Sequence, residues 1–337
     1  MRKYAIAAAT ALIATVALAA PAAQAGQSVT AGGASTQKII QDACAATYST
    51  DSVAYASTGS GTGRNNFLAG TYDFGGSDAA YAATDKLPSN FTYVPVIGVP
   101  VAIAFNIPGV KSLNLSAKIL AAILNGTYTT WNDPSIKALN PSANLPSSPI
   151  TVVYRSGSSG TTQNLARFLA GNGGTGWKDN GTWATASSKS NPVGISAANA
   201  GAVVSTVAST SGSIGYADLS DVAGKGLNFA AIRNPAGAYI KPTVAASAKF
   251  LSAQRVGTDG ILDIDYQAKI AGGYNLSLVS YAIAPTASAN AAKGTAVRNY
   301  LNYVITKCGP AKATKLNYVP LSGPLLVKAK ALVAKVK

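Results

Sequence analysis

The sequence contains no histidine and no glutamate, and charged residues make up only 12% of its 337 residues. Without histidine, a Ser-His-Asp triad, a His-ligated zinc ion and a histidine general base are all excluded. Carboxylate chemistry must come from the twelve acidic residues, which are all aspartates. These absences remove several classes of hydrolase and metalloenzyme from consideration.

Cysteine is also scarce, since Cys44 and Cys308 are the two that the chain contains. In an oxidising compartment an even pair of cysteines indicates one disulfide. The alternative is two separate buried thiols, and the spacing alone does not decide between them.

The N-terminus has the order of a secretory signal peptide. Arg2 and Lys3 precede an apolar run over residues 4–20, and Ala23-Gln24-Ala25 forms a small-x-small cleavage site before Gly26. No cysteine directly follows the run, so a lipoprotein anchor is not indicated. An uncleaved membrane anchor is the alternative. We expect residues 1–25 to be removed and the protein to act in the periplasm or outside the cell.

The net charge is strongly positive, at +15 for the full chain. Such a charge suits nucleic acid, a membrane surface or a small anion. We expect no nucleic-acid partner, because the protein is exported and has no basic block interleaved with aromatics. The C-terminal lysines 328, 330, 335 and 337 are interpreted as a solvated helix face rather than a membrane-binding device.

Short apolar runs alternate with longer segments of helical spacing, which predicts an α/β fold. Strands are expected at 28–31, 53–55, 73–76, 151–154 and 213–216, and helices at 36–48, 116–124, 161–170, 197–208, 291–307 and 325–337. Residues 94–105 carry two prolines and are predicted to form adjoining strands between two lobes. Residues 171–191 are rich in Gly, Asn and Ser and are predicted to form a surface loop.

One local pattern recurs four times: a strand ends in a turn of small residues that carries hydroxyls, usually at the start of a helix. The four turns are Ala34-Ser35-Thr36, Thr58-Gly59-Ser60-Gly61-Thr62-Gly63, Gly76-Ser77-Asp78 and Arg155-Ser156-Gly157-Ser158-Ser159-Gly160-Thr161. Helix N-termini attract oxyanions, glycine permits close approach, and Ser or Thr adds a donor. A single turn of this kind is weak evidence, but four together predict an anion site.

Two charged residues in these turns have a specific use in such a site. The Arg155 guanidinium can bind two oxygens of a tetrahedral anion at once. Asp78 suits a ligand that still carries a proton, since hydrogen phosphate can donate to a carboxylate and sulfate cannot. The alternatives are an ordinary surface arginine and a capping aspartate after Ser77.

The ordered set of motifs resembles the phosphate-binding proteins of Pst-type ABC phosphate importers and their secreted relatives, the DING proteins. The resemblance covers nearly all of the chain after residue 25. It is carried by Ala31-Gly32-Gly33-Ala34-Ser35, Gly59-Ser60-Gly61-Thr62-Gly63, Asp73-Phe74-Gly75-Gly76-Ser77-Asp78, Thr151-Val152-Val153-Tyr154-Arg155, Ser159-Gly160-Thr161-Thr162, Asn125-Gly126, Trp131-Asn132-Asp133-Pro134 and Gly212 to Asp218.

The resemblance implies a set of phosphate-binding residues in this sequence: Ser35, Thr36, Ser60, Asp78, Arg155, Ser159, Gly160 and Thr161. In that set Asp78 accepts the proton of the ligand, Arg155 supplies the charge, and residues 159–161 form a cradle at the start of a helix. No catalytic residue, cofactor or metal is implied.

The resemblance also implies a two-lobed periplasmic-binding-protein fold of type II, with the ligand in a cleft between lobes that close about a hinge. The first lobe is expected to be discontinuous, formed by residues 26–100 and 273–337, and the second to span 101–272. Both cysteines would then fall in the first lobe, where a bridge would tie its two segments together. The protein is expected to act as a monomer and to deliver phosphate to a membrane permease.

The sequence departs from the family at three places, one of which is Tyr274-Asn275 where the family usually has Tyr-Pro. Thr36-Gln37 replaces the usual apolar residue and proline, which leaves the backbone donor at Thr36 in place. Gly157 stands where many members have an aspartate that holds the arginine, so affinity and discrimination against arsenate are not implied by the resemblance.

Two other functions remain open at this stage. A secreted phosphomonoesterase is one, but Asp263-Ile264-Asp265 is the single Asp-x-Asp in the chain and fits a solvated strand better than a metal site. An extracellular matrix or appendage protein on the same fold is the other. We expect a non-enzymatic receptor.

Overall fold

The computed structural model describes residues 26–190 and 194–337, so the predicted signal peptide lies outside the described residues. The strands are β1 (Ser28–Gly33), β2 (Ser52–Ser57), β3 (Phe74–Ser77), β4 (Phe91–Asn106), β5 (Asn114–Leu115), β6 (Thr151–Arg155), β7 (Ile195–Ala197), β8 (Ser213–Asp218), β9 (Asn228–Phe229), β10 (Ala231–Arg233), β11 (Tyr239–Ile240), β12 (Arg255–Val256), β13 (Leu262–Asp263) and β14 (Ser277–Pro285).

The helices follow the same alternation along the chain. They are α1 (Lys38–Ala45), α2 (Ser60–Leu68), α3 (Ala117–Leu124), α4 (Pro134–Leu139), α5 (Gly160–Gly171), α6 (Trp183–Ala186), α7 (Ala200–Ser209), α8 (Leu219–Gly224), α9 (Val244–Leu251), α10 (Ala291–Tyr303), α11 (Gly309–Lys312) and α12 (Gly323–Val333). Two short 3-10 helices, η1 (Ser35–Gln37) and η3 (Thr314–Leu316), and one π-helix, η2 (Val304–Cys308), complete the set. In this part of the chain no helix has both the length and the apolar character needed to cross a bilayer.

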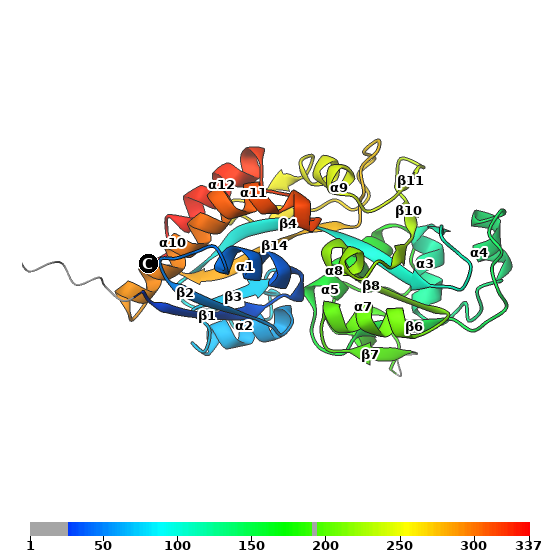
Figure 1. The fold of residues 1–337 in the computed structure, drawn as a ribbon, viewed down its shortest axis with the longest axis horizontal. Coiled ribbons are helices and arrows are strands. Elements are labelled where there is room, and N and C mark those ends of the chain that lie inside the picture. The colour runs from blue at the N-terminus through cyan, green and yellow to red at the C-terminus, as the bar shows by residue number, and fades with distance from the viewer. Residues whose placement is uncertain (1–25, 191–193) are drawn as a thin grey trace, which may run out of the picture.

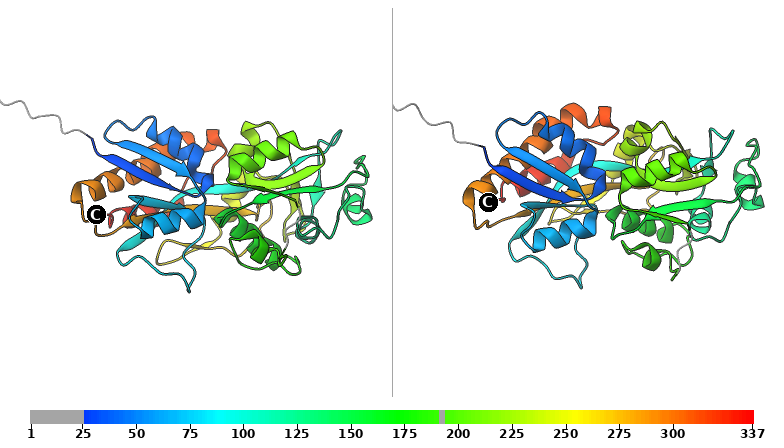
Figure 2. Two further views of the ribbon diagram at one scale, coloured as in Figure 1. Left: turned by 90° about the horizontal axis from the view of Figure 1, so that it is seen from below. Right: turned by 60° about the horizontal axis from the view of Figure 1, so that its bottom comes forward.

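The main sheet has the strand order β2-β1-β3-β14-β4-β8-β6-β7, and β4 belongs to both of its halves. The first part of β4 pairs with β14 and its last part, residues 101–106, pairs with β8. We call the elements around β1, β2, β3 and β14 the first lobe and those around β6, β7 and β8 the second lobe. Figure 1 shows β1 and the C-terminal helix α12 together in the first lobe, and both lobes stay distinct in Figure 2. The predicted two-lobed α/β architecture is therefore present.

The prediction of adjoining strands over residues 94–105 is wrong, because these residues all lie within the single 16-residue strand β4. Its two prolines lie where the ladder is interrupted. Pro95 pairs with Tyr281 just beyond a register shift in β14, and Pro100 lies where β4 exchanges β14 for β8 as its partner. Proline lacks a donor, so it is tolerated at such irregular positions. The strand can therefore run unbroken from one lobe into the other.

The prediction of a surface loop over residues 171–191 is wrong for the middle of that segment. It contains α6, and Trp177 and Trp183 are 5% and 3% exposed. The indoles pack edge to face, with ring centroids 5.3 Å apart. Gly, Asn and Ser predict a loop from local propensity, but two buried indoles supply enough apolar area to anchor the segment against the second lobe.

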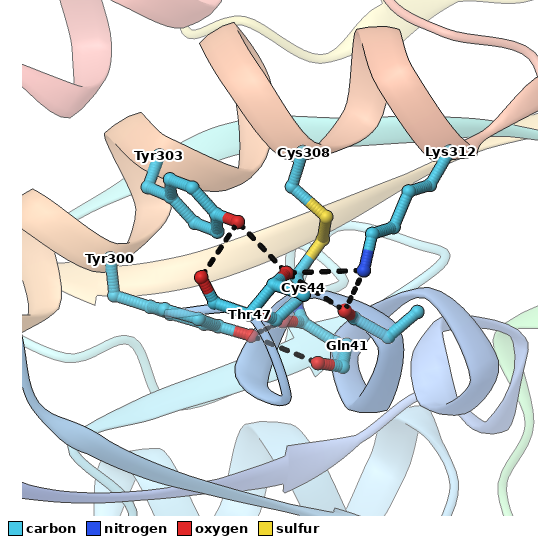
Figure 3. The surroundings of a disulfide bond; sticks show 8 residues. Gln41, Cys44, Thr47, Tyr300, Tyr303, Cys308 and Lys312 are labelled. Carbon is cyan, nitrogen blue, oxygen red and sulfur yellow. Dashed lines mark hydrogen bonds between the residues drawn. A yellow bond between two sulfur atoms is a disulfide. The ribbon is translucent and has the colours of Figure 1, made fainter. Parts of the chain in front are cut away.

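The two cysteines form a disulfide, which confirms the predicted bridge. Cys44 of α1 and Cys308 of η2 have Cα atoms 5.7 Å apart. Figure 3 shows the hydrogen bonds around the bridge, in which Tyr303 contacts Thr47 at 2.9 Å and Lys312 donates to the Ala43 carbonyl at 2.6 Å. The bridge therefore joins a helix near the start of the chain to the helices at its end.

Candidate functional site

The four turns predicted from the sequence converge on one buried site between the lobes. Three come from the first lobe, at η1, at the start of α2 and at the end of β3, and the fourth joins β6 to α5 in the second lobe. The side chain of Arg155 donates to Ser35 at 2.9 Å, and Thr161 donates to Asp78 at 2.9 Å. All eight predicted residues are buried: Ser35, Thr36, Ser60, Asp78, Arg155, Ser159, Gly160 and Thr161.

Arg155 is the last residue of β6 and is 2% exposed, so it is not an ordinary surface arginine. Its Nη1 donates to the hydroxyls of Ser35 and Ser159 at 2.9 and 3.2 Å, and its Nη2 donates to the Ala198 carbonyl at 3.1 Å. Its Nε is buried and makes no hydrogen bond within the described residues. Burial lowers the pKa of Arg155. A buried guanidinium with an unused donor is suited to an anion.

No carboxylate lies within ion-pairing distance of Arg155 among the described residues. Gly157 has nothing within 4 Å of the position that a Cβ would occupy. Burial lowers the pKa of Arg155, and Tyr216 with the carboxylates of Asp78, Asp218 and Asp221 opposes that effect through space. The guanidinium is therefore left without a carboxylate in direct contact.

Three serine hydroxyls in the site accept hydrogen bonds and donate none within the described residues. Ser35 accepts from Arg155 and from the backbone N–H at the start of α7, at 3.3 Å. Ser60 accepts from the backbone N–H of Asp78 at 3.1 Å. Ser159 accepts from Arg155 and from a backbone N–H in the first turn of α5, at 3.2 Å. Each hydroxyl also carries one hydrogen to donate. The site therefore has more donors than acceptors.

Asp78 is the carboxylate of the site, and it is 3% exposed. Its Oδ1 accepts from Thr36 and Ser280, each at 2.6 Å, and its Oδ2 accepts from Thr161 at 2.9 Å. A carboxylate has about four acceptor positions, so one on Oδ2 remains for a ligand proton. Burial raises the pKa of Asp78, while these hydroxyls and the charge of Arg155 oppose the rise. The carboxylate is thus engaged in the site and does not merely cap a turn.

Two glycines allow the turns to approach this closely. A Cβ at Gly160 would lie 2.7 Å from both Asp78 Cβ and Ser60 Oγ. Gly59, before α2, has a φ of +93° and faces the Arg155 guanidinium. A larger residue at Gly160 would push the two lobes apart, which explains the glycine at the start of α5.

The sequence analysis missed two parts of the site. Ser280 lies inside the buried strand β14 and is 0% exposed. The sequence feature that could have indicated its role is a hydroxyl within a largely apolar strand. The turn between β7 and α7 supplies the Ala198 carbonyl and the Ala200 N–H. It repeats the strand-turn-helix pattern, with Asn199 as the cap of α7. It carries no Ser or Thr hydroxyl, so the search for hydroxyl-bearing turns did not identify it.

The Asp-x-Asp at residues 263–265 lies outside the site. Asp263 forms an ion pair with Arg255 at 2.5 Å, and Asp265 accepts from the backbone of Gln267. Both aspartates are exposed, and the described ranges contain no group of three or more potential metal ligands. The solvated interpretation of this motif therefore agrees with the structure.

Comparison with known proteins places most of the chain in one family. Residues 19–307 match the family model of a PBP superfamily domain. The phosphate-binding protein PstS2 of Mycobacterium bovis BCG is 33% identical over 292 residues, which cover 82% of this chain and 76% of that protein. The phosphate-binding protein PstS of Xylella fastidiosa is 31% identical over 283 residues, which cover 81% of this chain and 75% of that protein.

Solved structures share the fold at lower identity. A high-affinity periplasmic phosphate-binding protein, PfluDING, bound with phosphate, has a TM-score of 0.75 and 23% identity, and covers 90% of this chain and 93% of its own. A phosphate-binding protein from Stenotrophomonas maltophilia has a TM-score of 0.68 and 22% identity over the same shares. Together with the two-lobed architecture and the sequence identity, these similarities show that the chain belongs to the PstS family of phosphate-binding proteins, within the PBP superfamily.

Proposed function

We propose that this protein captures inorganic phosphate between its two lobes and passes it to the membrane permease of an ABC importer. The observation that carries the proposal is the excess of buried donors around Arg155. The free Nε of Arg155, the hydroxyl hydrogens of Ser35, Ser60 and Ser159, and the N-terminus of α5 all require an acceptor. A small oxyanion with four acceptor oxygens meets that requirement.

Asp78 selects phosphate among such anions. Its remaining acceptor position can take the proton of hydrogen phosphate, whereas the fully ionised sulfate would place an oxygen against the carboxylate. Burial strengthens this discrimination, since water cannot screen the repulsion. Phosphate and sulfate have nearly the same shape, so the proton decides between them.

The proposed lobes are residues 26–100 with 273–337, and residues 101–272. The change of partner along β4 near Val101 supports this division. Lobe closure about the crossing strands would bring Asp78 and Arg155 to the same ligand. Delivery to a permease requires export, for which the predicted signal peptide is the basis, and we propose that the protein acts as a monomer outside the cytoplasm.

A catalytic role is not part of this proposal. The relatives with sequence identity above 30% are named as binding proteins. The site residues are buried, with exposures of 3% or less for Asp78 and Arg155, so the organic half of a phosphate ester would have to displace the contacts between the lobes. Neither a phosphomonoesterase nor a matrix function gains support from a particular contact in the site.

The decisive experiment is a calorimetric titration of the stripped protein with phosphate at about pH 8, where the ligand is mostly the dianion. The protein is first unfolded and refolded to remove bound anions, and sulfate, arsenate and a phosphomonoester are titrated in parallel. Tight one-to-one binding of phosphate without sulfate or ester is the expected result. No binding of phosphate would refute the proposal, and slow heat from ester turnover would favour a phosphatase.

A further inference from the structure

The segment from residue 172 to residue 190 packs directly behind the turn of residues 155–161, which we call the anion-binding turn. Its Trp183 lies between two tyrosines in a nearly parallel stack, 5.1 Å from Tyr154 with an interplanar angle of 13° and 5.5 Å from Tyr216 with an angle of 12°. Trp183 is 3% exposed and Tyr216 is 1% exposed. The stack therefore forms a rigid layer between this segment and the strands β6 and β8.

The Tyr216 hydroxyl connects this layer to both ends of the turn. The ladder between β6 and β8 ends at the pair Val153–Gly215, and beyond it the backbone N–H of Arg155 donates to Tyr216 Oη at 3.2 Å. The same hydroxyl lies 2.6 Å from Oγ1 of Thr162, in the first turn of α5. The side chain of Tyr216 thus holds Arg155 at the start of the turn and the first turn of helix α5 after it.

A backbone contact from the same segment fixes the middle of the turn. The Gly181 carbonyl accepts from the Ser159 N–H at 2.9 Å. A Cβ at Gly181 would lie 3.0 Å from the Ser159 carbonyl oxygen and 3.3 Å from its nitrogen. The two backbones are therefore in close contact just before the residues that form the start of α5.

We infer that the segment from residue 172 to residue 190 is a positioning element for the anion-binding turn, in which Trp183 acts together with Tyr216 of β8. This inference rests on the proposed function. The turn contains Gly157 between two serines, and Arg155 has no carboxylate partner within the described residues. Without external support, such a turn would sample many conformations and would have to be ordered when the ligand binds. The stack supplies this order in advance.

The most selective test is Tyr216→Phe, which removes one oxygen and keeps the ring in the stack. Burial raises the pKa of Tyr216 to about 12, so the hydroxyl is neutral across the range in which binding is measured. We expect the dissociation constant for phosphate to rise about fivefold, the effect of losing one hydrogen bond. The change should appear mainly as faster release of phosphate, and its size should be the same at about pH 7 and about pH 8.5, because the hydroxyl does not titrate there.

The second test compares two buried tryptophans of the same lobe. Trp183→Ala removes the stack, whereas Trp131→Ala removes an indole that is 0% exposed and donates to Gly212, before the start of β8 and away from the turn. Both variants should lose stability, since each leaves a large cavity. We expect Trp183→Ala to weaken phosphate binding by roughly tenfold or more, and Trp131→Ala to keep the affinity of the parent. Trp183→Phe should recover part of the loss.

Glycine variants give an independent comparison. Gly181→Ala introduces a methyl group against Ser159, whereas Gly224→Ala introduces one where nothing lies within 4 Å. Weaker phosphate binding in the first variant and parental binding in the second are expected. If Trp183→Ala does not fold, Trp183→Phe, Tyr216→Phe and this glycine pair decide the question.

The possible outcomes separate the inference from the proposed function. Parental affinity in folded Tyr216→Phe and Trp183→Ala would overturn the positioning role while leaving phosphate capture intact. An equal loss of affinity in Trp131→Ala would also overturn it, because the effect would then be general destabilisation. Failure of the parent protein to bind phosphate would overturn both.

Discussion

The hydroxyl of Thr161 donates to Oδ2 of Asp78 at 2.9 Å, and this hydrogen bond joins the second lobe to the first. Asp78 follows β3, and Thr161 lies in the first turn of α5. The bond from Arg155 to Ser35 crosses between the lobes in the same way. The residues that would bind the anion are therefore also the residues that hold the lobes together, so ligand binding and lobe closure depend on the same contacts.

Arg155→Ala is expected to abolish measurable phosphate binding. The substitution removes the buried charge and at least two donors that the anion requires. Such a loss typically lowers the affinity by about 100-fold or more. Titration calorimetry measures the affinity, and the phosphate-induced rise in melting temperature should vanish with it. Arg233→Ala, at an exposed position, is the matched control and should bind like the parent.

Arg155→Met should separate affinity from stability. The side chain is similar in length, but the buried charge without a carboxylate partner is gone. We expect the ligand-free variant to be as stable as the ligand-free parent or more so, although it no longer responds to phosphate. Urea unfolding without phosphate provides the measurement, and a large loss of stability would mean that Arg155 has a structural role of its own.

Asp78→Asn should weaken the exclusion of sulfate. The amide of asparagine is neutral, so it accepts the proton of phosphate more weakly than the carboxylate does. It also no longer repels an ionised oxygen of sulfate. Phosphate affinity is expected to fall by about tenfold, while sulfate binding becomes measurable. Competition titrations with both anions give the ratio of affinities. A ratio unchanged from that of the parent would show that the proton acceptor lies elsewhere.

Lower pH should reduce the preference of the unaltered protein for phosphate over sulfate. Burial raises the pKa of Asp78, so its carboxylate takes up a proton at a higher pH than an exposed aspartate does. As the pH falls through that value, the protonated group can donate to sulfate and can no longer accept from phosphate. The phosphate-to-sulfate ratio should therefore decrease from about pH 8 towards about pH 5. In Asp78→Asn the part of this pH dependence that comes from the carboxylate should be absent, which leaves only the part that comes from the protonation of phosphate itself.

Ser280→Ala tests a contact that the motifs did not reveal. Ser280 donates to Oδ1 of Asp78 at 2.6 Å and accepts from Nε2 of Gln37 at 2.9 Å. Its loss removes a bond that stabilises the ionised carboxylate, so the pKa of Asp78 should rise further. We expect phosphate affinity to fall by about fivefold. The pH at which sulfate begins to bind should move upward, and a purely structural serine would leave that pH unchanged.

Breaking the disulfide should reduce stability without changing the site. Cys44 and Cys308 are 264 residues apart in the sequence and join helices of the first lobe, whereas Arg155 lies at the end of β6 in the second lobe. Replacing both with serine, or reducing the bond, should lower the free energy of unfolding by about 2–5 kcal/mol. Urea unfolding with and without reductant measures this change. Phosphate affinity of the folded variant should equal that of the parent, and a large loss would indicate that the bridge also shapes the cleft.

Much of the site was predictable because its residues lie in local motifs. The turns at Ser35, Ser60 and Asp78, and the one from Arg155 to Thr161, each have a composition that predicts donors at the end of a strand. Ser280 was not predictable in this way, because its role depends on β14 pairing with β3 and β4, which no local pattern specifies. The same holds for Ala198, which contributes only a carbonyl oxygen.

The sequence by itself determined the fold class, the set of turns and the charge of the candidate site, because strand and helix periods and turn composition are local properties. It did not determine that β4 would run through both lobes as one strand that includes Pro95 and Pro100. That depends on the point at which the pairing partner of β4 changes from β14 to β8. Nor did it determine that Trp183 would pack behind Arg155. A Gly- and Asn-rich segment favours a loop by local propensity, and only tertiary burial of Trp183 against Tyr154 and Tyr216 overrides that preference.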